Sequence, residues 1–292
     1  MKSQLLDEVI ACLPTGKTHY RYYQGAYASR LLSMMLPEKV DLHKLKQTRF
    51  KRLLEHKSVK PIVSQCGDGV LDRQLLASSW CEPSQAFLLS VSRWGKNGGR
   101  YWNQTSRYGE NLVLQLNLPM QNLRHYQRWV DPSCQSTLNG TWSSHPVQTE
   151  VGKASFRETL AWARIDLDFE TNEALIEEVQ SDATRKVLSM SKHYKRCRCS
   201  VCSERLKYVN WFEPYLKLWS EALLCAAIEF IRCELGIERI FIHTARSGWQ
   251  VKKWIKAGMH LVLYTQIYRR NLDFYRLTLR QNFYYKRVAI SN

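Results

Sequence analysis

The sequence predicts a mixed α/β protein in which a sheet follows a helical N-terminal region. Apolar residues recur at helical spacing before residue 85, alternate with polar residues at 161–169, and then follow a strand–helix–strand order up to residue 244. We therefore expect a helical region at 1–85 and a mixed α/β domain at 86–292. The second part carries a basic, cysteine-containing insertion at 183–210.

The helical region is indicated by two apolar series, one at 26–35 and one at 45–54. A loop near 81–84 ends it, and the period then changes to two. Strands are predicted at 87–91 and 111–118, and the Ser-, Thr-, Gly- and Pro-rich stretch 131–152 is predicted to be a long surface loop.

The clearest pattern is a hairpin at 160–180, with its turn at 170–173. A helix follows at about 213–235, because Pro214 suits a first turn and Gly236 suits the position after a helix end. The apolar run 240–244 is predicted to be a buried strand. The second hairpin strand, the helix and this strand then form a right-handed, parallel βαβ unit. A helix at 250–256 and strands at 260–268 and 274–278 complete the expected order.

The composition excludes several classes of protein. The chain has 292 residues, 45% of them hydrophobic, with 13 Gly and 8 Pro, which excludes collagenous and largely disordered proteins. It has no run of about 18 apolar residues, so no membrane-spanning helix is expected. Acidic residues interrupt the N-terminus before an apolar segment forms, which excludes a secretory signal. We expect a soluble, cytoplasmic protein.

The charge predicts a polyanionic partner. A net charge of +17 attracts nucleic acid first, either RNA or DNA, and an anionic membrane surface second. The alternative is a basic surface that binds nucleic acid only weakly at low salt. Nine cysteines without a signal peptide do not indicate a disulfide framework.

Polar residues end both strands of the βαβ unit, where open α/β sheets bind ligands. Glu178, Asp182 and His243 are the predicted catalytic residues, since paired carboxylates beside His suit acid–base chemistry. The predicted substrate- or donor-binding residues are Arg164, Gln180, Ser181, Thr244, Arg246 and Tyr264. The alternative is a salt-bridged polar sheet face with Asp182 as a cap.

The insertion contains His193-x3-Cys197-x-Cys199-x2-Cys202, a spacing that suits zinc. The alternative is a flexible basic loop with free thiols. The predicted nucleic-acid contacts are Lys192, Lys195, Arg196, Arg198, Arg269 and Arg270. The last two lie in an aromatic and basic stretch that suits base stacking, or else forms edge strands with buried rings and exposed arginines.

The order of elements at 160–264 resembles the core of the GNAT (Gcn5-related) N-acetyltransferases. Gly236-Ile237-Glu238-Arg239-Ile240 and Lys256-Ala257-Gly258-Met259 are similar to two short steps of that family. The resemblance implies acetyl-CoA and acyl transfer. The family's pyrophosphate loop motif is absent, since Asp182-Ala183-Thr184-Arg185-Lys186 occupies its place.

A second resemblance is to bacterial and phage-encoded proteins that share an E-[IV]-Q-S-D strand end, matched by Glu178-Val179-Gln180-Ser181-Asp182. It implies a site without naming a reaction. Three functions stay open. The first is a GNAT-like transferase acting on nucleic acid or an associated substrate. The second is a non-catalytic, zinc-stabilised nucleic-acid-binding protein. The third is a toxin or phage-defence effector, such as a nucleic-acid ADP-ribosyltransferase.

Overall fold

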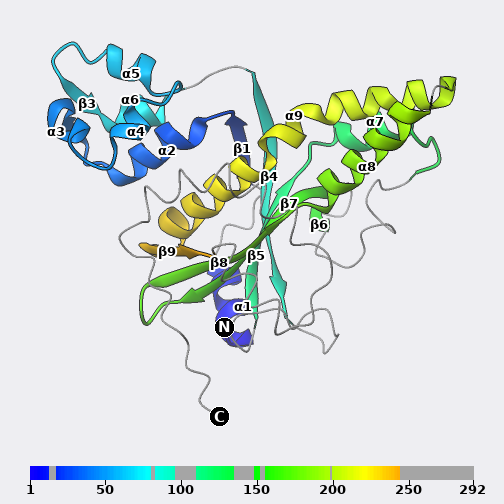
Figure 1. The fold of residues 1–292 in the computed structure, drawn as a ribbon. Coiled ribbons are helices and arrows are strands. Elements are labelled where there is room, and N and C mark those ends of the chain that lie inside the picture. The colour runs from blue at the N-terminus through cyan, green and yellow to red at the C-terminus, as the bar shows by residue number, and fades with distance from the viewer. Residues whose placement is uncertain are drawn as a thin grey trace.

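A computed structural model of the chain describes residues 1–12, 18–79, 83–95, 110–134, 148–151, 155–197 and 199–243. It confirms the predicted mixed α/β class: one long helix crosses a large sheet, and smaller helices gather at one side (Figure 1). The elements are α1 (Ser3–Cys12), β1 (Thr18–Tyr23), α2 (Ala26–Met35), β2 (Lys39–Asp41), α3 (Leu42–Lys46), α4 (Lys51–Leu54), α5 (Lys60–Ser64), β3 (Val70–Asp72), α6 (Arg73–Ala77), β4 (Ser84–Trp94), β5 (Asn111–Asn117), α7 (Gln121–Trp129), β6 (Gln148–Val151), β7 (Ser155–Asp168), β8 (Glu173–Gln180), α8 (Asp182–Arg196), α9 (Ser200–Glu229), a π-helical turn η1 (Phe230–Glu234) and β9 (Arg239–Ile242).

The large sheet has the strand order β1-β4-β5-β7-β8-β9, and β6 pairs with β7. The described neighbours pair antiparallel except β8 and β9, which run parallel. Helix α9 lies between β8 and β9 in the chain. The predicted hairpin and the predicted parallel strand–helix–strand unit are therefore both confirmed, and the sheet has a parallel pair at the β9 end.

One face of the sheet packs against α9 and forms the main hydrophobic core. Because side chains alternate along a strand, Ala161, Ala163 and Ile165 of β7 all face this core. Trp219, Leu223 and other apolar residues of α9 cover them. The other face of the sheet carries a small cluster of Trp94, Val113 and Trp162 together with polar side chains.

Residues 26–77 form a second unit with its own hydrophobic core, built from α2 to α6 and the small β2–β3 sheet. The unit is inserted between two paired strands, because β1 pairs with β4 and Tyr23 lies opposite Ser84. The expectation of an entirely helical region at 1–85 is therefore wrong for 18–23, which form an edge strand of the described sheet, and for 39–41 and 70–72, which pair as β2 and β3. Helix α1 also belongs to the main core, through Leu6 and Val9.

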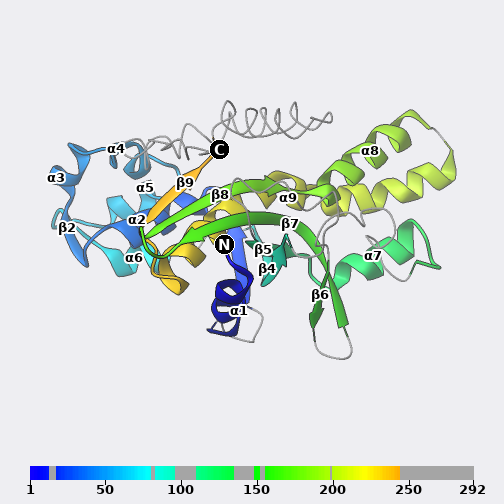
Figure 2. The ribbon, with the colours of Figure 1, turned by 90° about the horizontal axis from the view of Figure 1, so that it is seen from below.

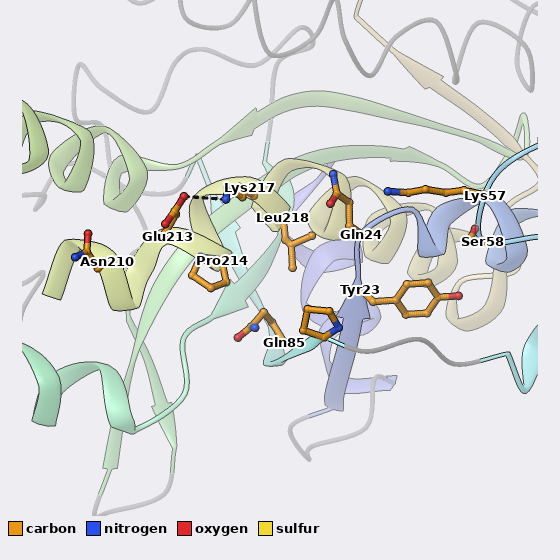
Figure 3. A pocket seen from close by; sticks show the side chains of 11 residues that line it. Tyr23, Gln24, Lys57, Ser58, Gln85, Asn210, Glu213, Pro214, Lys217 and Leu218 are labelled. Carbon is orange, nitrogen blue, oxygen red and sulfur yellow. Dashed lines mark ion pairs between the residues drawn. The ribbon is translucent and has the colours of Figure 1, made fainter. Parts of the chain in front are cut away.

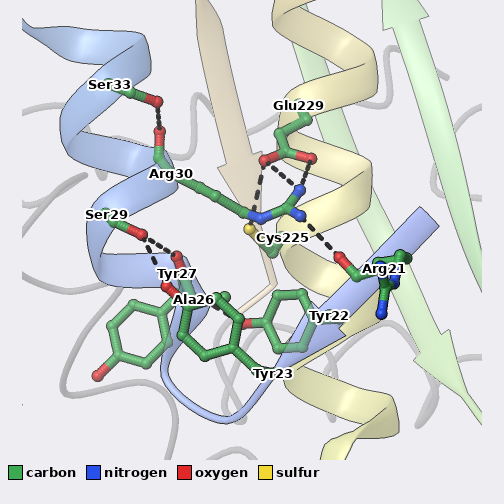
Figure 4. Close-up of polar contacts among 10 residues, drawn as sticks. All are labelled: Arg21, Tyr22, Tyr23, Ala26, Tyr27, Ser29, Arg30, Ser33, Cys225 and Glu229. Carbon is green, nitrogen blue, oxygen red and sulfur yellow. Dashed lines mark hydrogen bonds and ion pairs between the residues drawn. The ribbon is translucent and has the colours of Figure 1, made fainter. Parts of the chain in front are cut away.

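A polar network joins the N-terminal unit to α9 (Figure 4). The Nη1 of Arg30 donates to both carboxylate oxygens of Glu229, at 3.1 and 3.0 Å, and Nη2 donates to the backbone oxygen of Arg21 at 2.7 Å. The guanidinium lies 4.8 Å from the ring centroid of Tyr20. Burial raises the pKa of Cys225, which lies beside Glu229, well above its ordinary range.

The predicted insertion at 183–210 is two helices rather than a loop. It folds as α8 and the first residues of α9, which pack against each other as a helical hairpin, defined here as residues 182–212 without 198 (Figure 1). The helix expected at about 213 begins at Ser200, because Cys199 caps it and Cys202, Tyr208 and Phe212 join the core. Pro214 lies inside the helix instead of in its first turn.

The helical hairpin and the N-terminal unit lie at opposite ends of the sheet (Figure 2). Strand β6 occupies part of the stretch expected to be a loop at 131–152. The elements expected after residue 243 lie outside the described residues. None of the helices that the structure describes is both long and apolar enough to span a bilayer.

Candidate functional site

Strands β8 and β9 run side by side in the same direction, as predicted, but β9 ends four residues before the end of β8. Ile176 pairs with Ile242, so His243 directly follows the last paired residue of β9, while β8 continues to Gln180. The parallel arrangement brings His243 to the edge where Glu178 also lies. Thr244, Arg246 and Tyr264, predicted to bind substrate or donor, lie outside the described residues.

A β-bulge in β8 gathers two carboxylates around one guanidinium. Arg164 lies opposite Glu178, but Ile165 lies opposite Ile176, which leaves Glu177 as the extra residue. The Nη2 of Arg164 is 3.4 Å from Glu177 Oε2 and 3.2 Å from Glu178 Oε2. All three side chains are buried. Strict alternation would place Glu177 on the opposite face from Glu178, so no sequence signal identified it.

This arginine–glutamate cluster, Arg164 with Glu177 and Glu178, still has unused hydrogen-bond donors. Among the residues that the structure describes, the Nε and Nη1 of Arg164 have no hydrogen-bond partner although the side chain is buried, and the guanidinium lies 5.3 Å from the ring centroid of Trp94. A buried donor without a partner costs free energy, so native proteins rarely keep one without a reason. The arginine–glutamate cluster can therefore donate hydrogen bonds to an acceptor group of a ligand.

Gln180, Ser181 and Asp182, at the end of β8 and the start of α8, have two different roles. Gln180 Nε2 donates to Asp182 Oδ1 at 2.9 Å, and Asp182 pairs with Arg185. Ser181 is a helix cap: its hydroxyl accepts from the Thr184 N–H at 3.1 Å and donates to the Leu160 carbonyl at 2.5 Å. The structure therefore brings Gln180 and Asp182 together, and it uses Ser181 to begin α8.

Three thiols meet where α8 ends and α9 begins. Cys197 is the C-cap of α8 and Cys199 is the N-cap of α9, whereas Cys202 lies in the first turn of α9. Their sulfur atoms all lie within 4.8 Å of one another, and the Cys197 and Cys199 sulfurs are 3.1 Å apart. We call these three residues the thiol cluster.

The local contacts favour a thiolate in the thiol cluster. A hydrogen bond with Cys197, together with the backbone N–H of Cys202, lowers the pKa of Cys199 to about 7. A hydrogen bond with Cys197, together with desolvation, raises the pKa of Cys202 to about 12. Three sulfur donors at this separation suit a soft, tetrahedral ion such as Zn²⁺, whose thiolate ligands lie roughly 3.8 Å apart given Zn–S bonds of about 2.3 Å.

His193, predicted as the fourth ligand, is not part of the group of ligand atoms that the structure brings together. Its backbone carbonyl accepts from the Cys197 N–H at 3.2 Å, and its ring packs against Tyr194 with centroids 5.5 Å apart. The thiol cluster therefore supplies three ligands from two helices and leaves a fourth position for another donor.

Basic side chains surround the thiol cluster on the helical hairpin. Lys192, Lys195 and Arg196 are exposed in the last turns of α8. Arg205 of α9 lies 5.8 Å from the Tyr194 ring centroid, on the same hairpin. Of the other predicted nucleic-acid contacts, Arg198, Arg269 and Arg270 lie outside the described residues.

Comparison with family models, curated proteins and solved structures finds no match. The resemblance to the GNAT core stays a prediction, and the thiol cluster and the arginine–glutamate cluster are two candidate sites among the described residues.

Proposed function

We propose that the chain binds nucleic acid through the helical hairpin and that a zinc ion on the thiol cluster holds the tip of that hairpin. The observation that carries the proposal is the meeting of three sulfur atoms within 4.8 Å at the turn between two basic helices. A metal bound there would link the end of α8 to the start of α9, and its binding free energy would add to the stability of the turn.

Exposed cations at the tip supply the contact with phosphate. Lys192, Lys195 and Arg196 lie within five residues of one another and next to Cys197. Lysine and arginine side chains in such a cluster displace the counterions of a nucleic acid, which makes binding strongly dependent on salt. The net charge of +17 adds long-range attraction to the same partner.

The test compares two charge-matched variants. Lys192→Gln/Lys195→Gln/Arg196→Gln removes three positive charges from the hairpin, and Lys39→Gln/Lys44→Gln/Lys46→Gln removes three exposed ones from the N-terminal unit. Fluorescence anisotropy with labelled single-stranded RNA and DNA measures affinity against salt. We expect the hairpin variant alone to lower the slope of log K against log salt by about 2–3, near 0.7–0.9 for each lost phosphate contact. Equal losses in both variants would overturn the proposal.

The metal is tested in the same preparation. We expect one zinc per chain by elemental mass spectrometry, and none after Cys197→Ser/Cys199→Ser/Cys202→Ser. Cys12→Ser/Cys66→Ser/Cys233→Ser changes three cysteines outside the thiol cluster and should keep the zinc. Loss of zinc should lower affinity for the oligonucleotide, because the hairpin tip is no longer held. Full affinity in a zinc-free protein would contradict the role assigned to the metal.

A second candidate function, a GNAT-like transferase acting on nucleic acid or an associated substrate, is favoured by the parallel β8–β9 pair and the arginine–glutamate cluster. In this function, Glu178 takes a proton from the nucleophile that receives the acetyl group. The N–H groups of Arg164 that lack a partner donate hydrogen bonds to the substrate. His243 directly follows β9, and Asp182 begins α8 after the end of β8.

Acetyl transfer from labelled acetyl-CoA to RNA, DNA or bound protein tests the transferase directly. Glu178→Gln preserves side-chain shape and should abolish transfer while leaving oligonucleotide affinity unchanged. Transfer that survives in this variant would remove Glu178 as the base. A parallel incubation with NAD separates this candidate from an ADP-ribosyltransferase, which would consume NAD instead.

A further inference from the structure

A cavity of about 560 Å³ opens between the N-terminal unit and the middle of α9 (Figure 3). The turn after β1, the start of β4 and residues 57–58 complete its walls. The volume lies within the range typical of small-molecule sites. Neither the thiol cluster nor the arginine–glutamate cluster contributes a residue to it, so it is a separate candidate site.

The cavity combines amide groups with ammonium groups. Gln24, Gln85 and Asn210 each offer a carbonyl oxygen and an NH₂ group, the pairing that recognises the edge of a nucleobase. Lys57 and Lys217 offer positive charge. Figure 3 shows Gln24 and Lys57 on the same side of the cavity.

The acid that lines the described part of the cavity is already paired. Glu213 Oε1 lies 2.8 Å from Lys217 Nζ, and this lysine lowers the pKa of Glu213 below its ordinary value. Two ammonium groups against one carboxylate leave the cavity with an excess of positive charge. A neutral or anionic ligand is therefore favoured over a cation.

Pro214, which lines the cavity, removes the usual donor of one helix carbonyl. Proline has no N–H, so it cannot donate to the backbone carbonyl of Asn210 four residues earlier in α9. A proline inside a helix costs about 3 kcal/mol relative to alanine. The chain therefore carries a costly residue in the helix turn that follows Asn210, and both residues line the cavity.

We propose that this cavity binds one nucleoside phosphate, with its phosphate on Lys57 or Lys217 and the edge of its base on the amides of Gln24, Gln85 and Asn210. Tyr23, Pro83 and Leu218 supply apolar wall for the flat base. The ligand is either a free mononucleotide or the terminal nucleotide of a nucleic-acid strand. Only the second source rests on the proposed function: Asn210 lies ten residues, about 15 Å along a helix, from the start of α9 at the thiol cluster.

Calorimetry on the full chain tests the free ligand with AMP, GMP, CMP and UMP, with adenosine as the base alone and ribose 5-phosphate as the phosphate alone. We expect saturable binding of at least one mononucleotide, tighter than either fragment. Lys57→Gln should weaken that mononucleotide roughly tenfold, as expected for a lost charge-assisted contact, and leave adenosine unchanged. Gln85→Leu should weaken the mononucleotide and adenosine but not ribose 5-phosphate.

Matched controls lie on the N-terminal unit: Lys44→Gln and Gln74→Leu are exposed and outside the cavity. Pro214→Ala is a second variant that returns an N–H to the Asn210 carbonyl, and it should weaken the mononucleotide without lowering thermal stability. Equal affinity for AMP and ribose 5-phosphate would overturn the base contact. Failure of all four mononucleotides, with a 5′-phosphorylated oligonucleotide binding no better than a 5′-hydroxyl one, would overturn the site.

The two proposals fail separately. The hairpin variant Lys192→Gln/Lys195→Gln/Arg196→Gln should bind the mononucleotide normally, because none of its changes lies in the cavity. Loss of mononucleotide binding in that variant would contradict an independent cavity site.

Discussion

A single glycine determines how closely the N-terminal unit approaches the turn after β1. Gly25 has a φ of +86°, and a Cβ built on it would overlap Cε1 of His56. His56 is held in place, since its Nδ1 lies 2.8 Å from Ser58 Oγ and its ring packs 5.0 Å from Tyr27. The position therefore combines a left-handed backbone with a close contact, and either one alone would favour glycine.

Gly25→Ala should destabilise the protein by about 2–4 kcal/mol, the sum of left-handed strain near 1–2 kcal/mol and an overpacked contact of similar size. Gly69 separates the two effects, since its φ is +74° but a Cβ there meets nothing within 4 Å. Gly69→Ala should cost only the strain. Urea unfolding of both variants measures the difference, and equal losses would show that His56 moves aside freely.

The arginine–glutamate cluster shows how far the sequence could predict a site at this scale. Strand period placed Glu178 and Gln180 on one face and Arg164 within reach, and the ion pair of Arg164 with Glu178 agrees with that placement. Glu177 could not be predicted, because a one-residue bulge reverses the side of the sheet to which every later residue points. Ser181 fitted both a ligand-binding residue and a cap, and only its hydrogen bonds distinguish them.

At the scale of elements, α9 departs most from its prediction. Proline is favoured in the first turn of a helix, so Pro214 led to the prediction that this helix begins near residue 213. Helix α9 instead begins thirteen residues earlier, at Ser200, because the core contacts of Tyr208 and Phe212 outweigh the cost of an internal proline. Tertiary packing of this kind leaves no local signal. The hairpin β7–β8 and strand β9 carried strong local patterns and were predicted correctly.

Helix α9 also carries a half-buried carboxylate whose charge opposes folding. Glu221 Oε1 accepts from the Tyr22 hydroxyl and the Gly25 N–H, both at 2.7 Å, yet burial raises its pKa above the ordinary 4.5. A raised pKa means that the folded state binds the proton more tightly than the unfolded chain does. The resulting stabilisation is complete below about pH 4.5 and is lost as pH rises through the raised value.

Glu221→Gln should therefore become more stable relative to the natural protein as pH rises from 4 to 7, since an amide oxygen still accepts both hydrogen bonds without a charge. Glu204→Gln changes an exposed glutamate paired with Lys207 and should show no such gain. Thermal unfolding at several pH values measures both variants. A constant difference for Glu221→Gln across this range would contradict the burial of a charged group.

At the scale of the molecule, two hydrophobic cores are joined by α2, whose Ala26 and Leu31 lie in the main core, and by a few polar contacts. The pair of Arg30 with Glu229, in which Nη1 donates to both carboxylate oxygens, is the clearest of them, and both side chains are only about a quarter exposed, at 26% and 22%. Removing one partner leaves the other charge partly buried without its counterion. The pair therefore contributes more than an ordinary surface contact to the attachment of the N-terminal unit.

Arg30→Met should cost about 1–3 kcal/mol, less than a fully buried pair because water still reaches it. Lys51→Met breaks the exposed pair with Glu55, at 63% and 58% exposure, and should cost no more than about 0.5 kcal/mol. Hydrogen exchange should show faster exchange in α2 of the first variant only. Unchanged exchange there would mean that apolar contacts alone hold the unit in place.

The register of β1 and β4 places both ends of the N-terminal unit at the same point of the sheet. Tyr23 and Ser84 face each other across two hydrogen-bonded strands, so the chain leaves the sheet and returns to it at a single point. Everything between them occupies the place where a tight hairpin loop would ordinarily stand. An Asn-Gly linker in place of 24–83 should therefore connect β1 directly to β4. The shortened protein would reveal whether the large sheet and α9 can fold without the N-terminal unit.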